Sequence, residues 1–283
     1  MSAFDFRDIA RSVQLPNADL QFAIIACTGM LIVNEAIGAY SVSALFKLTA
    51  SFLFVAAGLS GATGSKSYAY FLEPENRSSL CVLAGLVLSA ISDFFLVPSK
   101  QAYRQGSNAR LAHSKSTSYK RGIFLSIVAR TAYAASFLSS INFSNVSFVL
   151  KASKSEFRSP DFVMTIGFGY LLINWLGFFE KERQFASWFE VPQELRSWLG
   201  GYLAVSVLMV ATATATDKGL QRITGAWLLM LSDIFAAASV FGVEDGRTSE
   251  SDEEWKPERA EWKTAAMGWI IYYGGQMVFA GCV

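Results

Sequence analysis

The sequence predicts an all-α integral membrane protein, a bundle of about eight transmembrane helices arranged as a 4+4 parallel repeat. Two features of the composition predict this class: 52% of the 283 residues are hydrophobic and only 17% are charged, against about 25% charged residues in soluble domains. A third is the grouping of apolar residues into separate stretches of about 18–20, the length that crosses a bilayer as a helix. Open sheet edges cannot be satisfied in lipid, so these stretches are expected to be helices.

The spans form a single domain over residues 20–283, after a polar segment at 1–19 that lacks the pattern of a cleavable signal peptide. They are expected near residues 20–37, 41–59, 80–97, 123–141, 162–179, 199–215, 223–241 and 264–281. A turn at Gly38 and Ala39 joins the first two. Polar loop insertions are expected at about 98–121 and 243–262.

The loop charges predict the orientation. We call the side of the amino terminus side one and the opposite side side two. The side-two segment 100–121 carries six Lys and Arg residues, so the positive-inside rule places side two in the cytoplasm and the amino terminus in the lumen or outside. Glycosylation sequons at Asn76, Asn142 and Asn145 fall near side-one loops, and a eukaryotic host would then favour the endoplasmic reticulum membrane.

Several functional classes are excluded by composition. The net charge of +1 gives no electrostatic basis for binding nucleic acid. The single histidine, His113, lies in a polar loop, and the three cysteines have no metal-ligand spacing. We therefore expect no metal and no cofactor. The acidic segment at 243–262 is interpreted as a solvated loop, with a regulatory phosphosite at Ser249 or Ser251 as the alternative.

An internal repeat is suggested by two similar segments, "GLVLSAISDFF" at 85–95 and "GAWLLMLSDIF" at 225–235. Both place an aspartate, Asp93 or Asp233, inside an apolar run, and the two lie 140 positions apart. The same offset relates Asn34 to Asn174. A duplicated four-helix unit has both ends on one side of the membrane, so its copies would be parallel.

The ionisable groups of the spans are predicted to converge in the half of the bundle near side two. An unpaired charge at membrane depth costs at least a few kcal/mol, so these groups are expected to share one hydrated site. They are Glu35, Lys47, Asp93, Arg130, Asp233 and Tyr273, and the polar Asn174 approaches the same depth. In the alternative interpretation, Glu35, Lys47 and Asp93 reach the headgroups, Asp233 forms a structural ion pair, Tyr133 and Tyr273 pack, and Gln276 bonds a neighbouring helix.

At these residues the sequence resembles the YhhN-like, or lysoplasmalogenase, family of membrane proteins. The resemblance runs from the second predicted span to the carboxyl end. The segments that carry it are "LFKLTASFLF" with Lys47, "GLVLSAISD" with Asp93, "GIFLSIVARTAY" with Arg130 and Tyr133, "YLAVSVLM" with Tyr202 and Met209, "GAWLLMLSD" with Asp233, and "YYGGQ" with Tyr272, Tyr273 and Gln276. The sequence departs from the family pattern at Leu48, Ser92 and Arg130, where the family has Pro, Gly and His.

The resemblance implies a hydrolase of lysophospholipids that cleaves the vinyl-ether bond of lysoplasmalogen to a fatty aldehyde and a glycerophospho-alcohol. Asp93 and Asp233 would be catalytic, with the deeper Asp233 as acid and Asp93, nearer in depth to Lys47 and Arg130, as anion and base. The substrate-binding residues would be Lys47, Arg130, Tyr133, Tyr273, Glu35, Asn174 and Gln276.

Two other functions stay open at this point. Parallel repeats with polar groups between them are also typical of transporters, in which polar residues near side one would matter as well. Arginine in place of the family histidine at 130 is a poor proton donor, which favours a catalytically inactive, lipid-binding member. Aldehyde release by the purified protein separates the hydrolase from both.

Overall fold

A computed structural model describes residues 13–63, 73, 76–100, 103, 115–139, 157–176, 191–216, 219–241 and 261–283. Within them the chain forms eight long helices: α2 (Ala18–Ile37), α3 (Tyr40–Thr63), α5 (Arg77–Leu96), α8 (Thr117–Leu138), α9 (Ser159–Trp175), α10 (Gln193–Ala215), α11 (Leu220–Phe241) and α12 (Glu261–Ala280). The described residues contain no strand, only an isolated bridge between Phe157 and Thr216. The predicted all-α fold is confirmed, and each helix coincides with one of the eight predicted spans.

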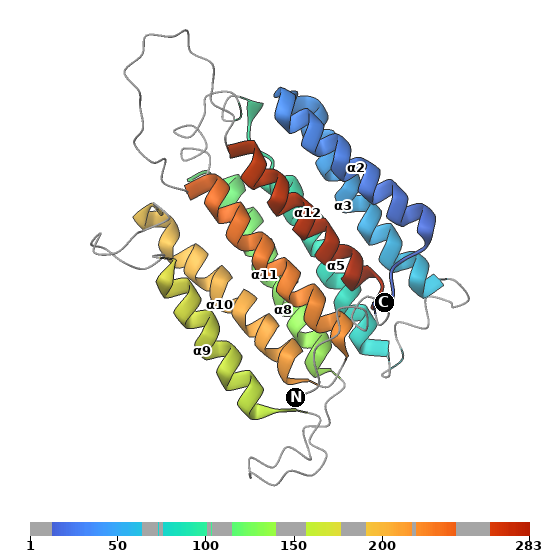
Figure 1. Ribbon diagram of the computed structural model, residues 1–283, viewed down its shortest axis with the longest axis vertical. Helices are drawn as coiled ribbons and strands as arrows, with labels where there is room; N and C mark the ends of the chain where they lie inside the picture. The colour runs from blue at the N-terminus through green and yellow to red at the C-terminus, as the bar shows by residue number, and fades with distance from the viewer. Residues whose placement is uncertain are drawn as a thin grey trace.

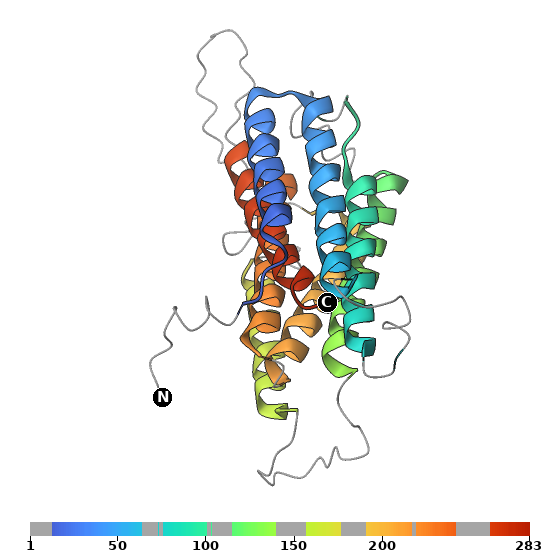
Figure 2. The ribbon, with the colours of Figure 1, turned by 90° about the vertical axis from the view of Figure 1, so that its right-hand side faces the viewer.

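The helices form one bundle with their axes roughly aligned (Figures 1 and 2). The α2–α3 pair lies at one edge and the α9–α10 pair at the other, with α5, α8, α11 and α12 between them (Figure 1). Contacts connect α3 to α5 and α12, and connect α10 to α8 and α11. The four central helices connect the two edge pairs, because α5 packs on α8 and α12 packs on α11. The duplication that the sequence suggests stays a prediction.

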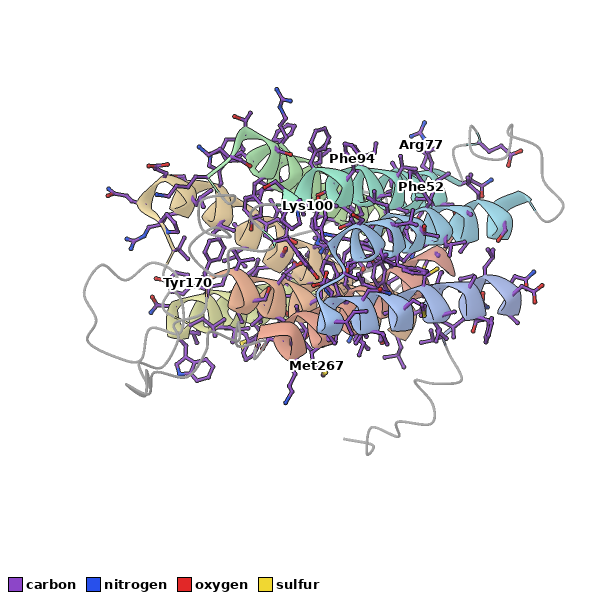
Figure 3. The ribbon with its side chains drawn as sticks, turned by 90° about the horizontal axis from the view of Figure 1, so that it is seen from above. Phe52, Arg77, Phe94, Lys100, Tyr170 and Met267 are labelled. Atoms are coloured by element: carbon purple, nitrogen blue, oxygen red, sulfur yellow. The ribbon has the colours of Figure 1, made fainter. Side chains whose placement is uncertain are left out.

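Five helices are long and apolar enough to cross a membrane, namely those at Ala18–Ile37, Tyr40–Gly61, Arg77–Leu96, Gln193–Ala215 and Leu220–Phe241. The other three differ for local reasons: α9 has 17 residues, and α8 and α12 carry more polar residues, among them Arg130 and Gln276. Large apolar side chains such as Phe52, Phe94 and Tyr170 point outward from the bundle (Figure 3). Such an apolar exterior is what a lipid-facing surface requires.

The ends of several helices follow from local sequence. Asn17 caps α2 by accepting a hydrogen bond from the backbone N–H of Asp19. Gly38 ends this helix in the left-handed conformation, with φ at 74°, which glycine adopts without steric cost. The predicted turn between the first two spans is therefore confirmed. Ser116 caps α8 through the backbone N–H of Tyr119.

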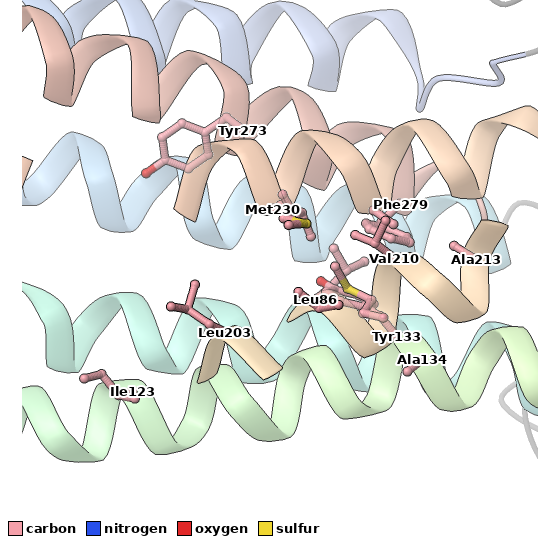
Figure 4. Packing of buried hydrophobic residues seen from close by; sticks show 14 of the residues in the cluster. Leu86, Ile123, Tyr133, Ala134, Leu203, Val210, Ala213, Met230, Tyr273 and Phe279 are labelled. Carbon is pink, nitrogen blue, oxygen red and sulfur yellow. The ribbon is translucent and has the colours of Figure 1, made fainter. Parts of the chain in front are cut away.

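The middle of the bundle is packed by aromatic rings against small residues. Tyr133 of α8 and Phe279 of α12 stack with ring centroids 4.4 Å apart, and they lie among the buried apolar side chains of Figure 4. A Cβ added at Gly85 would overlap the Tyr133 ring, and one added at Gly225 would come within 3.2 Å of Phe279. Small residues allow this close approach where lipid gives helices little hydrophobic reason to associate.

Several predictions concern residues outside the described ranges. These residues are the first twelve positions, His113, the sequons at Asn142 and Asn145, and most of the expected insertions at 98–121 and 243–262.

Candidate active site

Asp93 lies near the end of α5 and is buried, with 5% of its surface exposed. Its Oδ2 accepts hydrogen bonds from Ser51 Oγ of α3 at 2.6 Å and from the Tyr272 hydroxyl of α12 at 2.9 Å. Its Oδ1 has Lys47 Nζ at 4.0 Å, which is an ion pair longer than a hydrogen bond. We call Lys47, Ser51, Asp93 and Tyr272 the Asp93 cluster; three helices supply it.

Asp233 lies in the second half of α11 and is 8% exposed. Its Oδ1 accepts hydrogen bonds from Arg130 Nη2 of α8 at 2.9 Å and from the Tyr202 hydroxyl of α10 at 2.5 Å. Its Oδ2 accepts one from Ser206 Oγ at 3.0 Å. These four residues, Arg130, Tyr202, Ser206 and Asp233, form the Asp233 cluster. Both oxygens of this carboxylate are held by short bonds, so its position is fixed.

Arg130 pairs with a different aspartate from the one that the sequence indicated. The sequence associated it with Asp93, but its guanidinium bonds Asp233 directly. Depth in fact favours Asp233, because within the predicted spans Arg130 lies seven residues from the side-two end, Asp233 eight and Asp93 four. Arg130 still interacts electrostatically with Asp93 and with Tyr272. Arg130 therefore belongs to the Asp233 cluster and also interacts with the Asp93 cluster.

Three further predicted site residues are buried next to the clusters. The Tyr133 hydroxyl donates to Gln276 Oε1 at 2.7 Å and lies 3.5 Å from Ser89 Oγ. Tyr273 donates to the backbone oxygen of Lys47 at 3.1 Å. Its ring and that of Tyr133 belong to the apolar core of Figure 4. These residues combine a packing role with polar contacts close to the aspartates.

Glu35 and Asn174 lie away from the two clusters. Glu35 is half-buried near the end of α2 and accepts a hydrogen bond from the Tyr103 hydroxyl at 3.0 Å, although it interacts electrostatically with Lys47. Asn174 is exposed at the end of α9. Among the described helices, α9 packs chiefly on α10, so the structure does not bring Asn174 to either aspartate.

The hydroxyl donors of the site were missed by sequence reasoning. Ser51, Ser206, Tyr202 and Tyr272 all bond an aspartate, yet none was among the expected site residues. One signal was available. Ser51 follows Lys47 by four residues and Ser206 follows Tyr202 by four, a spacing that puts both members of a pair on one helix face.

Four enclosed polar atoms find no hydrogen-bond partner in the described part of the chain: Ser43 Oγ, Arg130 Nε, Trp269 Nε1 and Gln276 Nε2. Unpaired buried polar atoms are uncommon in native interiors. Three of the four are nitrogen donors, and so the site has spare capacity for a ligand that accepts hydrogen bonds. Across the whole described part of the chain, no group of three or more His, Cys, Asp or Glu side chains could hold a metal ion.

The comparison with protein families places the two clusters in a known family. A model of the YhhN family matches residues 42–283, which is most of the chain. The chain belongs to the YhhN family. The comparison with curated proteins found no match, and neither did the comparison with solved structures. Both aspartate clusters lie wholly inside the region that matches the YhhN family, so the suspected resemblance is confirmed where the site is built.

Proposed function

We propose that the protein is a membrane-embedded hydrolase that cleaves the vinyl-ether bond of lysoplasmalogen, giving a fatty aldehyde and a glycerophospho-alcohol. The observation that carries the proposal is a pair of buried aspartates in unequal surroundings within a YhhN family member. Vinyl ethers react by protonation at the outer alkenyl carbon, which leaves an oxocarbenium ion. Such a reaction needs one protonated acid and one fixed negative charge.

The hydrogen bonds support the two roles in the reverse order to the one expected from depth. Asp233 receives an arginine, a tyrosine and a serine at hydrogen-bond distance, and these donors stabilise its negative charge. Asp93 has its cation 4.0 Å away, and its Oδ1 has no closer donor among the described residues. Asp93 therefore serves as the acid and Asp233 as the permanent anion.

The reaction then proceeds in three steps. The Asp93 carboxylic acid gives its proton to the outer alkenyl carbon, and the Asp233 carboxylate stabilises the resulting oxocarbenium ion. Water adds to the cationic carbon while the Asp93 carboxylate accepts one of its protons, forming a hemiacetal. In the last step the bond to the glycerol oxygen breaks as that oxygen takes the proton from Asp93. The hemiacetal hydroxyl gives its own proton to the Asp93 carboxylate, which releases aldehyde and alcohol and restores the carboxylic acid. One carboxyl group thus acts in turn as acid and base.

The departure at Arg130 fits this scheme. An arginine does not donate a proton at neutral pH, but the scheme asks only that it keep Asp233 charged, and their atoms lie 2.9 Å apart. The site opens toward side two in this proposal. Side two is taken as the cytoplasmic face of an endoplasmic reticulum membrane, with membrane lipid as the source of substrate.

The test is aldehyde release by protein purified into nanodiscs and given lysoplasmalogen or an acyl lysophospholipid. We expect aldehyde from the vinyl ether alone. In D2O the aldehyde should carry one deuterium on the carbon next to the carbonyl, because that carbon is the one protonated. Asp93→Asn and Asp233→Asn should each abolish release, while Asp161→Asn, at the start of α9 and partly exposed, should not change it.

Three outcomes would count against the proposal. Activity that survives both aspartate substitutions would remove the two carboxylates from the mechanism. Cleavage of the acyl lipid alone would make the protein an esterase. Binding of lysoplasmalogen with no aldehyde from the wild-type protein would leave the inactive, lipid-binding alternative.

A further inference from the structure

One face of α3 carries three buried polar residues at successive turns. Ser43, Lys47 and Ser51 are spaced by four residues, so they lie in a line along the helix, and their exposed fractions are 2%, 7% and 1%. The hydroxyl of Ser51 donates a hydrogen bond to Asp93. The hydroxyl of Ser43, one turn further toward side two, is enclosed and has no hydrogen-bond partner among the described residues.

A second unpaired donor lies across from this line on α12. The indole ring of Trp269 packs under the ammonium group of Lys47, with Nζ 4.4 Å from the ring centroid. The N–H of that indole is enclosed and likewise without a partner in the described part of the chain. Lys47 itself approaches Asp93 only at 4.0 Å. Its ammonium hydrogens therefore remain available to a ligand.

The chemistry of these three groups identifies what they would bind. An ammonium and an indole N–H can only donate hydrogen bonds, and a serine hydroxyl can donate as well. Three donors around one positive charge suit a group with several acceptor oxygens and a negative charge, such as a phosphate ester. A neutral carbonyl or hydroxyl would accept from one or two donors and leave the charge of Lys47 unmatched.

We propose that Ser43, Lys47 and Trp269 form the subsite that binds the phosphate diester of the substrate. This inference rests on the proposed function for the identity of the lipid. The phosphate and the alkenyl ether are attached to the same three-carbon glycerol, so a phosphate site has to adjoin the reacting carboxyl group without covering it. Lys47 meets that requirement, since it is the neighbour of Asp93 on the side of Ser43.

Glu35 provides a test of whether the bound group is negatively charged. It is the carboxylate that interacts electrostatically with Lys47 from α2, and its negative charge opposes a bound anion. Removing that charge should therefore strengthen the binding of a phosphate diester, whereas removing a donor should weaken it. A purely structural role for the cluster predicts no such opposition.

The experiment uses a pair of probes that cannot be cleaved. One is 1-O-alkyl-glycero-3-phosphomethanol, a saturated ether with a singly charged phosphate diester and no amine; the other is 1-O-alkylglycerol, which lacks the phosphate. Binding to the full chain in nanodiscs is measured by calorimetry. Ser43→Ala and Trp269→Phe should each weaken the phosphate probe by about 10-fold, Lys47→Met should weaken it further, and Glu35→Gln should tighten it. Binding of alkylglycerol should stay unchanged in Ser43→Ala and Trp269→Phe.

Thermal unfolding without a probe separates binding from folding. Ser43→Ala removes a donor that has no partner, so its melting temperature should stay the same or rise. Trp269→Phe also shortens a ring that contacts Lys47 and Tyr273, so its measure is the difference between the two probes. A fall in the melting temperature of Ser43→Ala would indicate that this hydroxyl holds the structure together and would overturn the subsite. Ser41→Ala and Lys263→Met, at exposed positions on the same two helices, are the matched controls and should bind both probes as the wild type does.

The subsite and the proposed reaction can fail separately. Equal affinity of the wild-type protein for the two probes, or equal losses for both probes in Ser43→Ala and Trp269→Phe, would overturn the subsite even if aldehyde were released. Selective binding of the phosphate probe without any aldehyde release from lysoplasmalogen would retain the subsite and overturn the hydrolase.

Discussion

The Asp93 and Asp233 clusters have the same construction but hold their carboxylates differently. In each, the helix before the aspartate supplies a serine, Ser51 or Ser206, that donates to Oδ2. In each, a tyrosine hydroxyl adds a second bond. The difference is the cation: a guanidinium bonds Asp233 at 2.9 Å, whereas an ammonium group stays 4.0 Å from Asp93.

Under the proposed function, this difference lets one motif serve two chemical purposes. A carboxylate that is fully hydrogen-bonded to an arginine stays charged and cannot move, whereas one with a distant cation can exchange a proton at lower cost. Paired carboxyl groups in unequal environments are a general way to separate an acid from an anion. The aspartates alone look interchangeable in sequence; their neighbours on other helices distinguish them.

The largest expected difference between the two clusters is in the free energy of unfolding. Asp233→Leu leaves the buried guanidinium of Arg130 without its partner, and we expect a loss of about 3–5 kcal/mol in the free energy of unfolding. Asp93→Leu should cost clearly less because Lys47 is not hydrogen-bonded to it. Denaturant titration of the purified variants measures both.

A double variant tests whether the unpaired charge of Arg130 causes the loss of stability in Asp233→Leu. Asp233→Leu combined with Arg130→Met replaces the whole pair by apolar side chains, and stability should return to near the wild-type value. An equal loss in both single aspartate variants would show that the two clusters are equally tight.

The motif glycines extend the comparison to packing. Gly85 and Gly225 each precede their aspartate by eight residues, but a Cβ at Gly85 would overlap the Tyr133 ring, whereas one at Gly225 would sit 3.2 Å from Phe279. We expect Gly85→Ala to cost about 1–3 kcal/mol and Gly225→Ala less. Comparison of their thermal midpoints tests this order, which a reversed result would contradict.

A smaller effect separates the two serines. Among the described residues only Ser206 donates to Oδ2 of Asp233, whereas Oδ2 of Asp93 keeps Tyr272 if Ser51 is lost. Ser206→Ala should therefore lower stability by about 1.5 kcal/mol, and Ser51→Ala by less. Thr substitutions, which retain the hydroxyl, are the controls.

The smallest expected effect is at Asn174. The side chain is exposed at the end of α9, so Asn174→Ala should change neither aldehyde release nor stability by more than about 0.5 kcal/mol. Loss of activity in this variant would show that α9 contributes to the site after all.

Helix positions were predictable from the sequence because they depend on local apolar runs and on turns such as the one at Gly38. The burial of Asp93 and Asp233 was predictable for the same reason, since a lone carboxylate in an apolar run must find partners inside the bundle. Lys47 was correctly associated with Asp93 because both lie near side-two ends of their helices.

The partners across helices were not predictable in this way. Depth ranks residues along the membrane normal but says nothing about rotation around each helix. Asn174 has a suitable depth but faces outward. The serine donors carry no charge, so ionisable groups did not point to them, and Tyr202 and Tyr272 were indicated only as members of the segments that resemble the family.

The depth of the two aspartates has a consequence for lipid traffic. Asp93 lies three residues before the end of α5 and Asp233 eight before the end of α11, and those ends are on the same face of the bundle. At about 1.5 Å per residue, both lie in the half of the bilayer nearest that face. If the protein has the proposed function, a lipid in the opposite monolayer is protected from the reaction until it flips across. The protein then controls the composition of one monolayer directly and of the other only at the speed of that exchange.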